Sequence, residues 1–346
     1  MTAQPSSAGA CDACHAEIAA ANANSLHSNL WGYKAVIERR GQCDFETTAA
    51  AQEGFGRNCA ECHTTCGQCH VSRPISVGGG FVDAHKFRRT PSMVENCTAC
   101  HGSRISYDFT GEDVAVLPDI HYARGHSCEL CHWAEEMHGD GQSTNPSGHY
   151  EHRYEVATMP RCEKCHVKEI MDEGHADDPE WNGDYHAAHW DGWTGVELQC
   201  QVCHSQPYKN CTFCHVQDPS GYTIDPSVVA FKIGKNTQPE TRGEYDYTVV
   251  RHVPIHPDTY ETWPLALPGY SELPTWKYAS PHNVRRWTAQ TTVEGGQSCG
   301  YACHDRAGQD PRGFYLREVD LQDELGADLI DAAANAGVVI READLH

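Results

Sequence analysis

Few segments of this chain keep a regular period of apolar and polar residues. Residues 11–40 are rich in alanine and place apolar residues at helical spacing, and residues 319–339 repeat leucine and isoleucine in a similar way. Both segments predict helices. Residues 227–234 and 245–253 are instead β-branched and aromatic, with Gly and Pro around them. They predict two or three strands arranged as a hairpin.

The composition changes this picture, because apolar residues are too few for a large core of side chains. Only 39% of the 346 residues are hydrophobic, and 30 Gly and 18 Pro predict much irregular structure. Lys and Arg number 26 against 48 Asp and Glu, a net charge of −22. This balance argues against binding nucleic acid or an anionic membrane surface, since both need a basic face. No stretch approaches the roughly 18 apolar residues of a transmembrane segment.

Nineteen cysteines carry the candidate chemistry. Eighteen of them form nine pairs, each followed directly by His; two residues separate the cysteines in eight pairs and three in the ninth. The paired residues are Cys11 and Cys14, Cys59 and Cys62, Cys66 and Cys69, Cys97 and Cys100, Cys128 and Cys131, Cys162 and Cys165, Cys200 and Cys203, Cys211 and Cys214, and Cys299 and Cys303. The histidines after them are His15, His63, His70, His101, His132, His166, His204, His215 and His304.

The pattern C-x-x-C-H is the attachment signature of a c-type haem. Two thiols one turn apart add to the two porphyrin vinyl groups, and the next imidazole can then bind the iron as the proximal ligand. Zinc sites draw four protein ligands from paired knuckles, and disulfide frameworks need no histidine. We therefore expect nine c-type haems. Cys43 is left over; we expect a free or buried thiol, with an intermolecular disulfide or a stray ligand as alternatives.

Each haem iron also needs a distal ligand. Fourteen histidines remain against five methionines, which favours bis-histidine ligation and low reduction potentials. His15 and His27 would lie about 18 Å apart along a helix, so His27 is expected to serve another haem. The expected distal ligands are His27, His85, His121, His138, His186, His189, His252 and His282. The ninth stays open among His126, His149, His152, His175 and His256.

The motifs and the phrases between them resemble the multihaem c-type cytochromes of anaerobic respiration. More narrowly, they are similar to a group of eight-to-nine-haem cytochromes of the cell surface or periplasm. The phrases that carry the resemblance are Cys59–His70, Ile120–Cys128, Met137–Gly141, Cys200–Cys211 and Thr275–Asn283. It implies electron transfer, with His121, His138, His189 and His282 as axial ligands. Some members polymerise into extracellular filaments, and the sequence leaves open whether this chain does.

The expected fold is a multihaem cytochrome c, with mostly irregular chain and short α-helices packed around covalently bound haems. Residues 1–217 carry eight motifs, and the haem-poor segment 218–280 is expected to hold a minor β-hairpin. Residues 281–346 carry the ninth motif and the expected C-terminal helix. We expect these three segments to form one haem-cored unit. The haem-poor segment would cap haem faces or, alternatively, contact another subunit.

The expected function is electron transport along closely packed haems, in anaerobic respiration or extracellular electron transfer, rather than enzymatic catalysis. The alternative is a terminal reductase of nitrogen or sulfur oxyanions, which would need one haem with an open coordination position. The negative charge favours positively charged redox proteins or ferric minerals as partners. Because haem is attached outside the cytoplasmic membrane, we expect an exported protein, either periplasmic, at the cell surface or extracellular. The first ten residues lack signal-peptide features, so the chain is expected to be a mature form.

Overall fold

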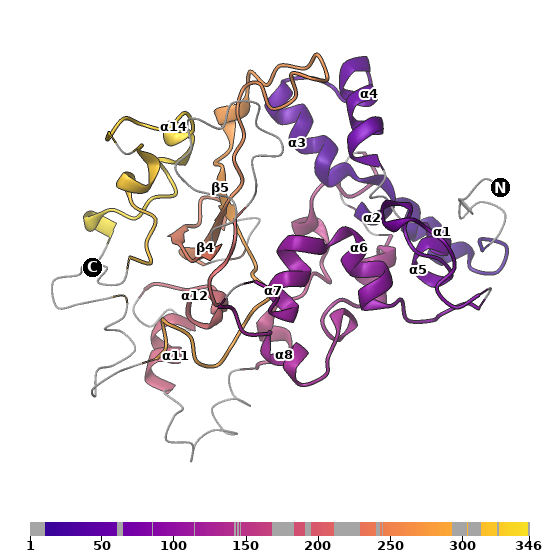
Figure 1. The fold of residues 1–346 in the computed structure, drawn as a ribbon, viewed down its shortest axis with the longest axis horizontal. Coiled ribbons are helices and arrows are strands. Elements are labelled where there is room, and N and C mark those ends of the chain that lie inside the picture. The colour runs from indigo at the N-terminus through magenta and orange to yellow at the C-terminus, as the bar shows by residue number, and fades with distance from the viewer. Residues whose placement is uncertain are drawn as a thin grey trace. The chain divides into compact units, whose positions relative to one another are not determined.

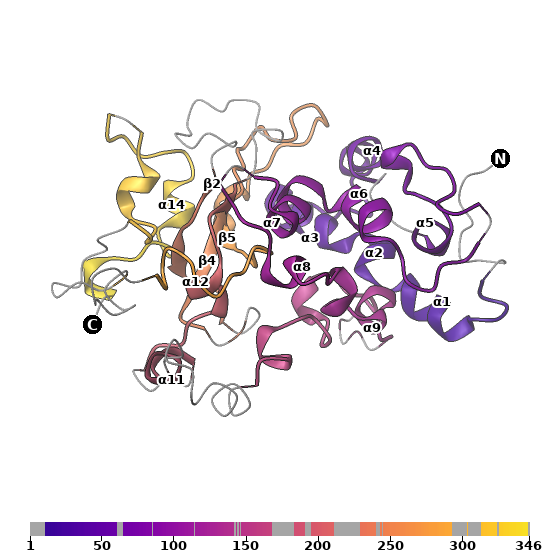
Figure 2. The same cartoon turned by 60° about the horizontal axis from the view of Figure 1, so that its bottom comes forward.

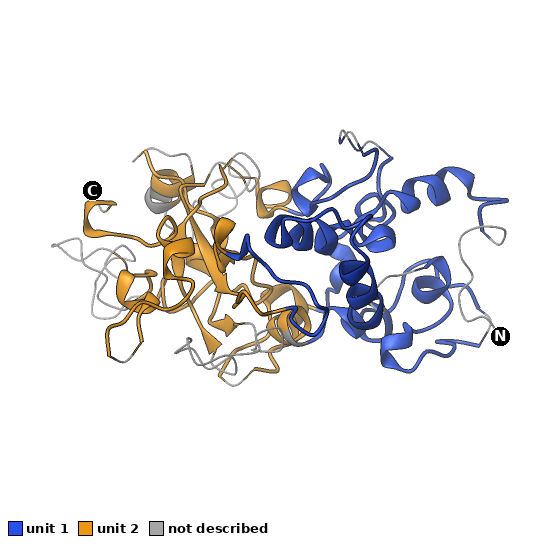
Figure 3. Ribbon diagram, turned by 90° about the horizontal axis from the view of Figure 1, so that it is seen from above, with its two compact units in different colours: residues 1–102, 125–160, 260–270 blue, residues 103–124, 161–259, 271–346 orange. Residues whose placement is uncertain are grey.

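The structure is a computed structural model in which short helices and small sheets are joined by irregular chain (Figure 1). It describes residues 11–60, 65–84, 86–113, 115–141, 143, 145, 147–167, 183–190, 195–210, 229–239, 243, 245–292, 303, 313–323 and 325–344. Figure 3 shows two compact units. Unit 1 comprises residues 1–102, 125–160 and 260–270, and unit 2 comprises residues 103–124, 161–259 and 271–346. These boundaries differ from the three consecutive segments expected from the sequence, because the chain leaves and re-enters each unit.

Unit 1 is helical in its described residues. Its α-helices are α1 (Ala16–Ala23), α2 (Leu26–Asn29), α3 (Trp31–Gly41), α4 (Ala49–Asn58), α5 (Cys66–His70), α6 (Thr98–Cys100) and α9 (Ala134–His138). The single helix predicted over residues 11–40 is therefore wrong. Ser25 caps α2 by accepting a hydrogen bond from the Ser28 amide, and Leu30 ends α2 with a left-handed φ of +57°. Both features interrupt the helical hydrogen bonds and divide the segment into three helices, although the apolar spacing continues across them.

Helices α1 and α9 lie side by side within unit 1 (Figure 2). Gly139 follows α9 with φ +78° and ψ 153°, a backbone conformation that is essentially restricted to glycine. A Cβ at this position would lie 2.8 Å from the Ala21 carbonyl oxygen of α1. The glycine therefore permits the close approach of the two helices.

Unit 2 combines short helices with strands. Its helices are α7 (Tyr107–Thr110), α8 (Ile120–Ala123), α11 (Gly183–Trp190), α12 (Cys200–His204) and α14 (Ala332–Asn335). Its strands are β1 (Tyr208–Lys209), β2 (Val229–Ala230), β3 (Ile233–Lys235), β4 (Tyr247–His252) and β5 (Trp276–Tyr278). β1 pairs with β2, and β3, β4 and β5 form an antiparallel sheet in that order. β2 and β4 fall within the two segments for which strands were expected, and β3 extends one residue beyond the first of them, to Lys235.

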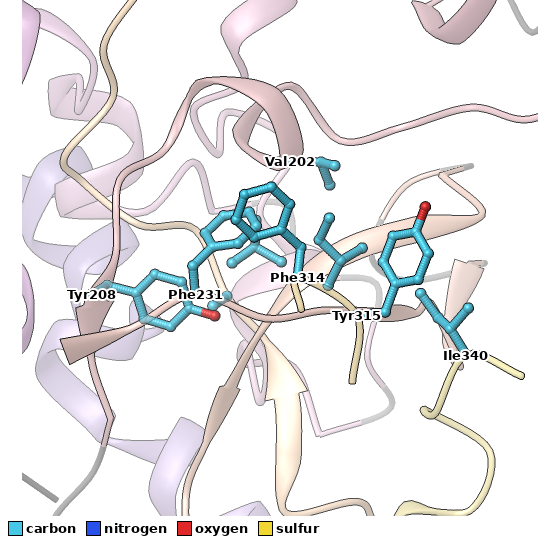
Figure 4. Packing of buried hydrophobic residues seen from close by; sticks show 9 residues of the cluster. Val202, Tyr208, Phe231, Phe314, Tyr315 and Ile340 are labelled. Atoms are coloured by element: carbon cyan, nitrogen blue, oxygen red, sulfur yellow. The ribbon is translucent and has the colours of Figure 1, made fainter. Parts of the chain in front are cut away.

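An apolar cluster packs against this sheet in unit 2 (Figure 4). It includes Val202 from α12, Phe231 beside β3 and Ile340 near the C-terminus. A second cluster joins Val250 and Trp276 to Leu316, Leu321, Val338 and Val339. Segments distant in sequence therefore pack against β4 in two apolar clusters.

The C-terminal helix predicted over residues 319–339 is also wrong. Among the described residues of this segment, only a 3-10 turn at Glu318–Leu321 and α14 are helical. Gln322 and Asp328 form an antiparallel bridge around Gly326, whose φ is +81°. This turn brings both Leu321 and Leu329 into buried positions without a continuous helix. Among the described residues, no helix is long and apolar enough to cross a membrane.

Candidate functional site

Each motif whose residues are fully described contains a helical turn. The amides of His15, His101, His132 and His166 donate to the carbonyl of the first cysteine of their own motif, at 2.8–3.0 Å. The remaining two such motifs form the helices α5 and α12. In α5, Thr65 and Gln68 form a capping box that fixes where the helix begins. This turn holds two thiols and an imidazole in the order that haem attachment needs.

Four motif histidines lie beside histidines that the sequence nominated as distal ligands. The ring centroids are 6.2 Å apart for His27 and His101, 5.9 Å for His70 and His138, 6.0 Å for His121 and His166, and 6.2 Å for His186 and His204. The first two pairs lie in unit 1 and the last two in unit 2. In each pair the partners are distant in sequence or belong to different helices, so tertiary folding brings them together.

The separation within these pairs fits a metal ion between two imidazoles. With a metal–nitrogen bond of about 2 Å and about 1.1 Å from Nε2 to the ring centroid, two axial imidazoles have centroids about 6 Å apart. The porphyrin supplies the other four ligands of a haem iron, so the protein needs to provide only two. The four centroid separations are therefore of the size that ligation of one iron by two imidazoles would need.

Backbone carbonyls hold the Nδ1 atoms of two motif histidines. His70 Nδ1 lies 2.6 Å from the Arg88 carbonyl oxygen, and His204 Nδ1 lies 3.2 Å from that of Arg285. A carbonyl oxygen can only accept, so Nδ1 carries the proton in both rings. This leaves the lone pair on Nε2, which is the atom that binds a metal.

Carboxylates occupy the same position at two other histidines. His121 Nδ1 lies 2.9 Å from Asp119 Oδ1, and His132 Nδ1 lies 3.0 Å from both Glu136 oxygens. Sequence reasoning did not single out either acid. The available signal was their spacing, two residues before one histidine and one helical turn after the other.

Burial keeps His27 neutral at ordinary pH. It lowers the pKa of His27 to about 4, and the neighbouring His101, His132 and His138 lower it further when charged. Burial likewise lowers the pKa values of His138, His166 and His204. A neutral imidazole has the lone pair that metal binding needs, so these environments favour ligation over protonation.

First cysteines from different motifs lie close enough to affect each other's ionisation. The neighbouring Cys97 thiol raises the pKa of Cys128, and the neighbouring Cys162 thiol raises the pKa of Cys200. Burial and the neighbouring Cys11 raise the pKa of Cys66. Each pair lies within one unit, so these motifs are immediate neighbours in space.

Three other expected ligands have different surroundings. His252 is buried in β4, where its Nε2 lies 3.0 Å from Asp331 Oδ2 and its ring stacks on Trp276. His189 lies in the last turn of α11, and its carbonyl oxygen accepts from the Leu198 amide. The backbone of His282 hydrogen-bonds to Asp108.

The open candidates for the ninth ligand are spread over both units. His149 stacks on Trp31 with centroids 4.7 Å apart, and His152 stacks on Tyr154 at 4.8 Å. His256 Nδ1 lies 2.8 Å from Asp258, and His126 is exposed. The predicted site residues outside the described residues are Cys62, His63, His85, His175, Cys211, Cys214, His215, Cys299 and His304.

Among the described residues, no three His, Cys, Asp or Glu side chains converge as a metal-binding group. Comparison of the chain with protein-family models, with curated proteins and with solved structures found no match. The assignment of the site therefore depends on the motifs and the geometry of this chain.

Proposed function

We propose that this chain is a multihaem c-type cytochrome that carries electrons along nine closely packed bis-histidine haems. It would act as an exported electron carrier for redox proteins or ferric acceptors in anaerobic respiration or extracellular electron transfer. The observation that carries the proposal is the set of four histidine pairs with centroids 5.9–6.2 Å apart, each joining a C-x-x-C-H histidine to a second histidine.

In this proposal the chain supplies tethers, ligands and low-dielectric surroundings. Paired cysteines would hold each haem covalently, the paired histidines would bind its iron, and the acceptors at Nδ1 would orient the histidine rings. When bound, each haem supplies a one-electron ferric–ferrous couple. At the four sites with paired histidines, ligation by both rings would leave no iron position open for a substrate, which favours an electron carrier over a reductase.

Two further observations support close packing of the haems. The closeness of Cys97 to Cys128 and of Cys162 to Cys200 would bring the attachment points of different haems together. Asn96, next to Cys97, donates to the carbonyls of Gln68 and Ser72 at 2.7 and 2.9 Å. This buried side chain ties the fourth motif to the third.

The spin state of the oxidised protein tests the proposal. We expect only low-spin ferric signals by electron paramagnetic resonance, reduction of all haems at low potential, and no turnover of nitrite or hydroxylamine. A high-spin signal equal to one haem, together with turnover of either substrate, would instead identify a terminal reductase.

A further inference from the structure

We propose that Asp119, acting through His121, lowers the reduction potential of the haem held by His121 and His166. Its reduction potential would therefore be lower than that of the haem held by His186 and His204 in the same unit. This inference rests on the proposed function and adds a difference in potential between two of its haems. Asp119 is a positioning and tuning residue, because it contacts the ligand and not the iron.

The Asp119 carboxylate is held rigidly beside the ring of His121. Its Oδ1 atom accepts from His121 Nδ1 at 2.9 Å and from the His121 amide at 2.7 Å. Its Oδ2 atom accepts from the Val284 amide at 2.8 Å. The Asp119 side chain is only 4% exposed, so solvent and salt screen its charge weakly.

In the pair of His186 and His204, the acceptor at His204 Nδ1 is uncharged. His204 Nδ1 donates to the Arg285 carbonyl oxygen at the longer distance of 3.2 Å. Both sites pair two histidines, and they place a carboxylate beside His121 Nδ1 and a neutral carbonyl oxygen beside His204 Nδ1.

A buried carboxylate acceptor draws the Nδ1 proton toward itself and increases electron density on the imidazole. The imidazole then becomes a more basic ligand, which stabilises ferric iron over ferrous iron. The nearby negative charge acts in the same direction. His132 has the same arrangement independently, since the Glu136 side chain that accepts from its Nδ1 is 7% exposed.

The test is a redox titration of the full-length holoprotein with the substitution Asp119→Asn, followed by optical and electron paramagnetic resonance spectra. Asparagine keeps a carbonyl acceptor for His121 and removes the charge, and its amide nitrogen can no longer accept from the Val284 amide. We expect one of the nine haems to lose about tenfold of its preference for ferric iron, which is about 59 mV for a one-electron couple. Glu112→Gln is the control, because it removes an exposed carboxylate of the same unit. We expect no shift there.

A titration curve unchanged by Asp119→Asn, with that haem still low-spin, would overturn the proposal. Conversion of the haem to high spin would show that Asp119 only positions the His121 ring. This result would also contradict the proposal. If Asp119→Asn does not fold, Glu136→Gln decides: an upward shift of one haem supports carboxylate tuning, and no shift overturns it. Failure of the proposed function would look different, because the unmutated protein would then lack bis-histidine haem spectra.

Discussion

His27 lies beside a motif histidine from a distant part of the chain, which makes it the clearest test of a proposed iron ligand. It lies in the short helix α2, and its ring faces His101, the histidine of the fourth motif. In the substitution His27→Ala, we expect one ferric haem to change from low to high spin. The haem count should not change, because Cys97 and Cys100 still hold the porphyrin. Electron paramagnetic resonance and a haem assay measure the two quantities.

Two matched substitutions test whether the spin change in His27→Ala comes from the loss of an iron ligand. His27→Met should keep the haem low-spin and raise its potential, because methionine is a weaker donor to ferric iron. His252→Asn should leave every haem low-spin, since His252 Nε2 is held by Asp331. It should instead lower the free energy of unfolding by roughly 1–3 kcal/mol by weakening a buried hydrogen-bond network. An unchanged spin state in His27→Ala would contradict the ligand assignment.

The local chemistry of these residues was predictable, and their partners were not. The helical turn of each described motif follows from neighbouring residues, so spacing alone predicts it. The contact between His27 and His101 depends on how distant segments pack. His252 looked like a spare ligand for the same reason: only the fold places it beside Asp331, which comes from the C-terminal segment.

At the scale of elements, the pairing of α1 with α9 depends on Gly139. We expect Gly139→Ala to lower the free energy of unfolding by roughly 3 kcal/mol. The new Cβ would meet the Ala21 carbonyl, and the backbone conformation at this position is essentially restricted to glycine. Gly148→Ala is the control, since its φ is +75° but a Cβ there meets nothing within 4 Å. It should cost only about 1–2 kcal/mol. Thermal unfolding followed by circular dichroism compares the two; equal losses would contradict the close-packing argument.

The element boundaries show where apolar periodicity is insufficient. Residues 11–40 carry helical spacing, yet Ser25 and Leu30 divide them into three helices. Leu321 and Leu329 also have helical spacing, but a bridged turn buries them. The β-branched segments were more informative, because β3 and β4 pair within them. Caps and turns thus determine boundaries that the apolar pattern does not reveal.

At the scale of the whole molecule, the proposed haems add to an already negative charge. The chain carries −22, and two propionates on each haem make the holoprotein more negative. A negative field stabilises ferric iron, which lowers reduction potentials throughout. It also attracts positively charged partners and ferric surfaces and repels oxyanion substrates. The charge therefore favours an electron carrier for such partners.

The most direct measurement is the intact mass and iron content of the protein produced in a host that attaches c-type haem. The account predicts the 38.3 kDa polypeptide plus nine covalently bound haems, with nine iron atoms per chain. The bare polypeptide mass, or stoichiometric zinc in place of iron, would contradict it.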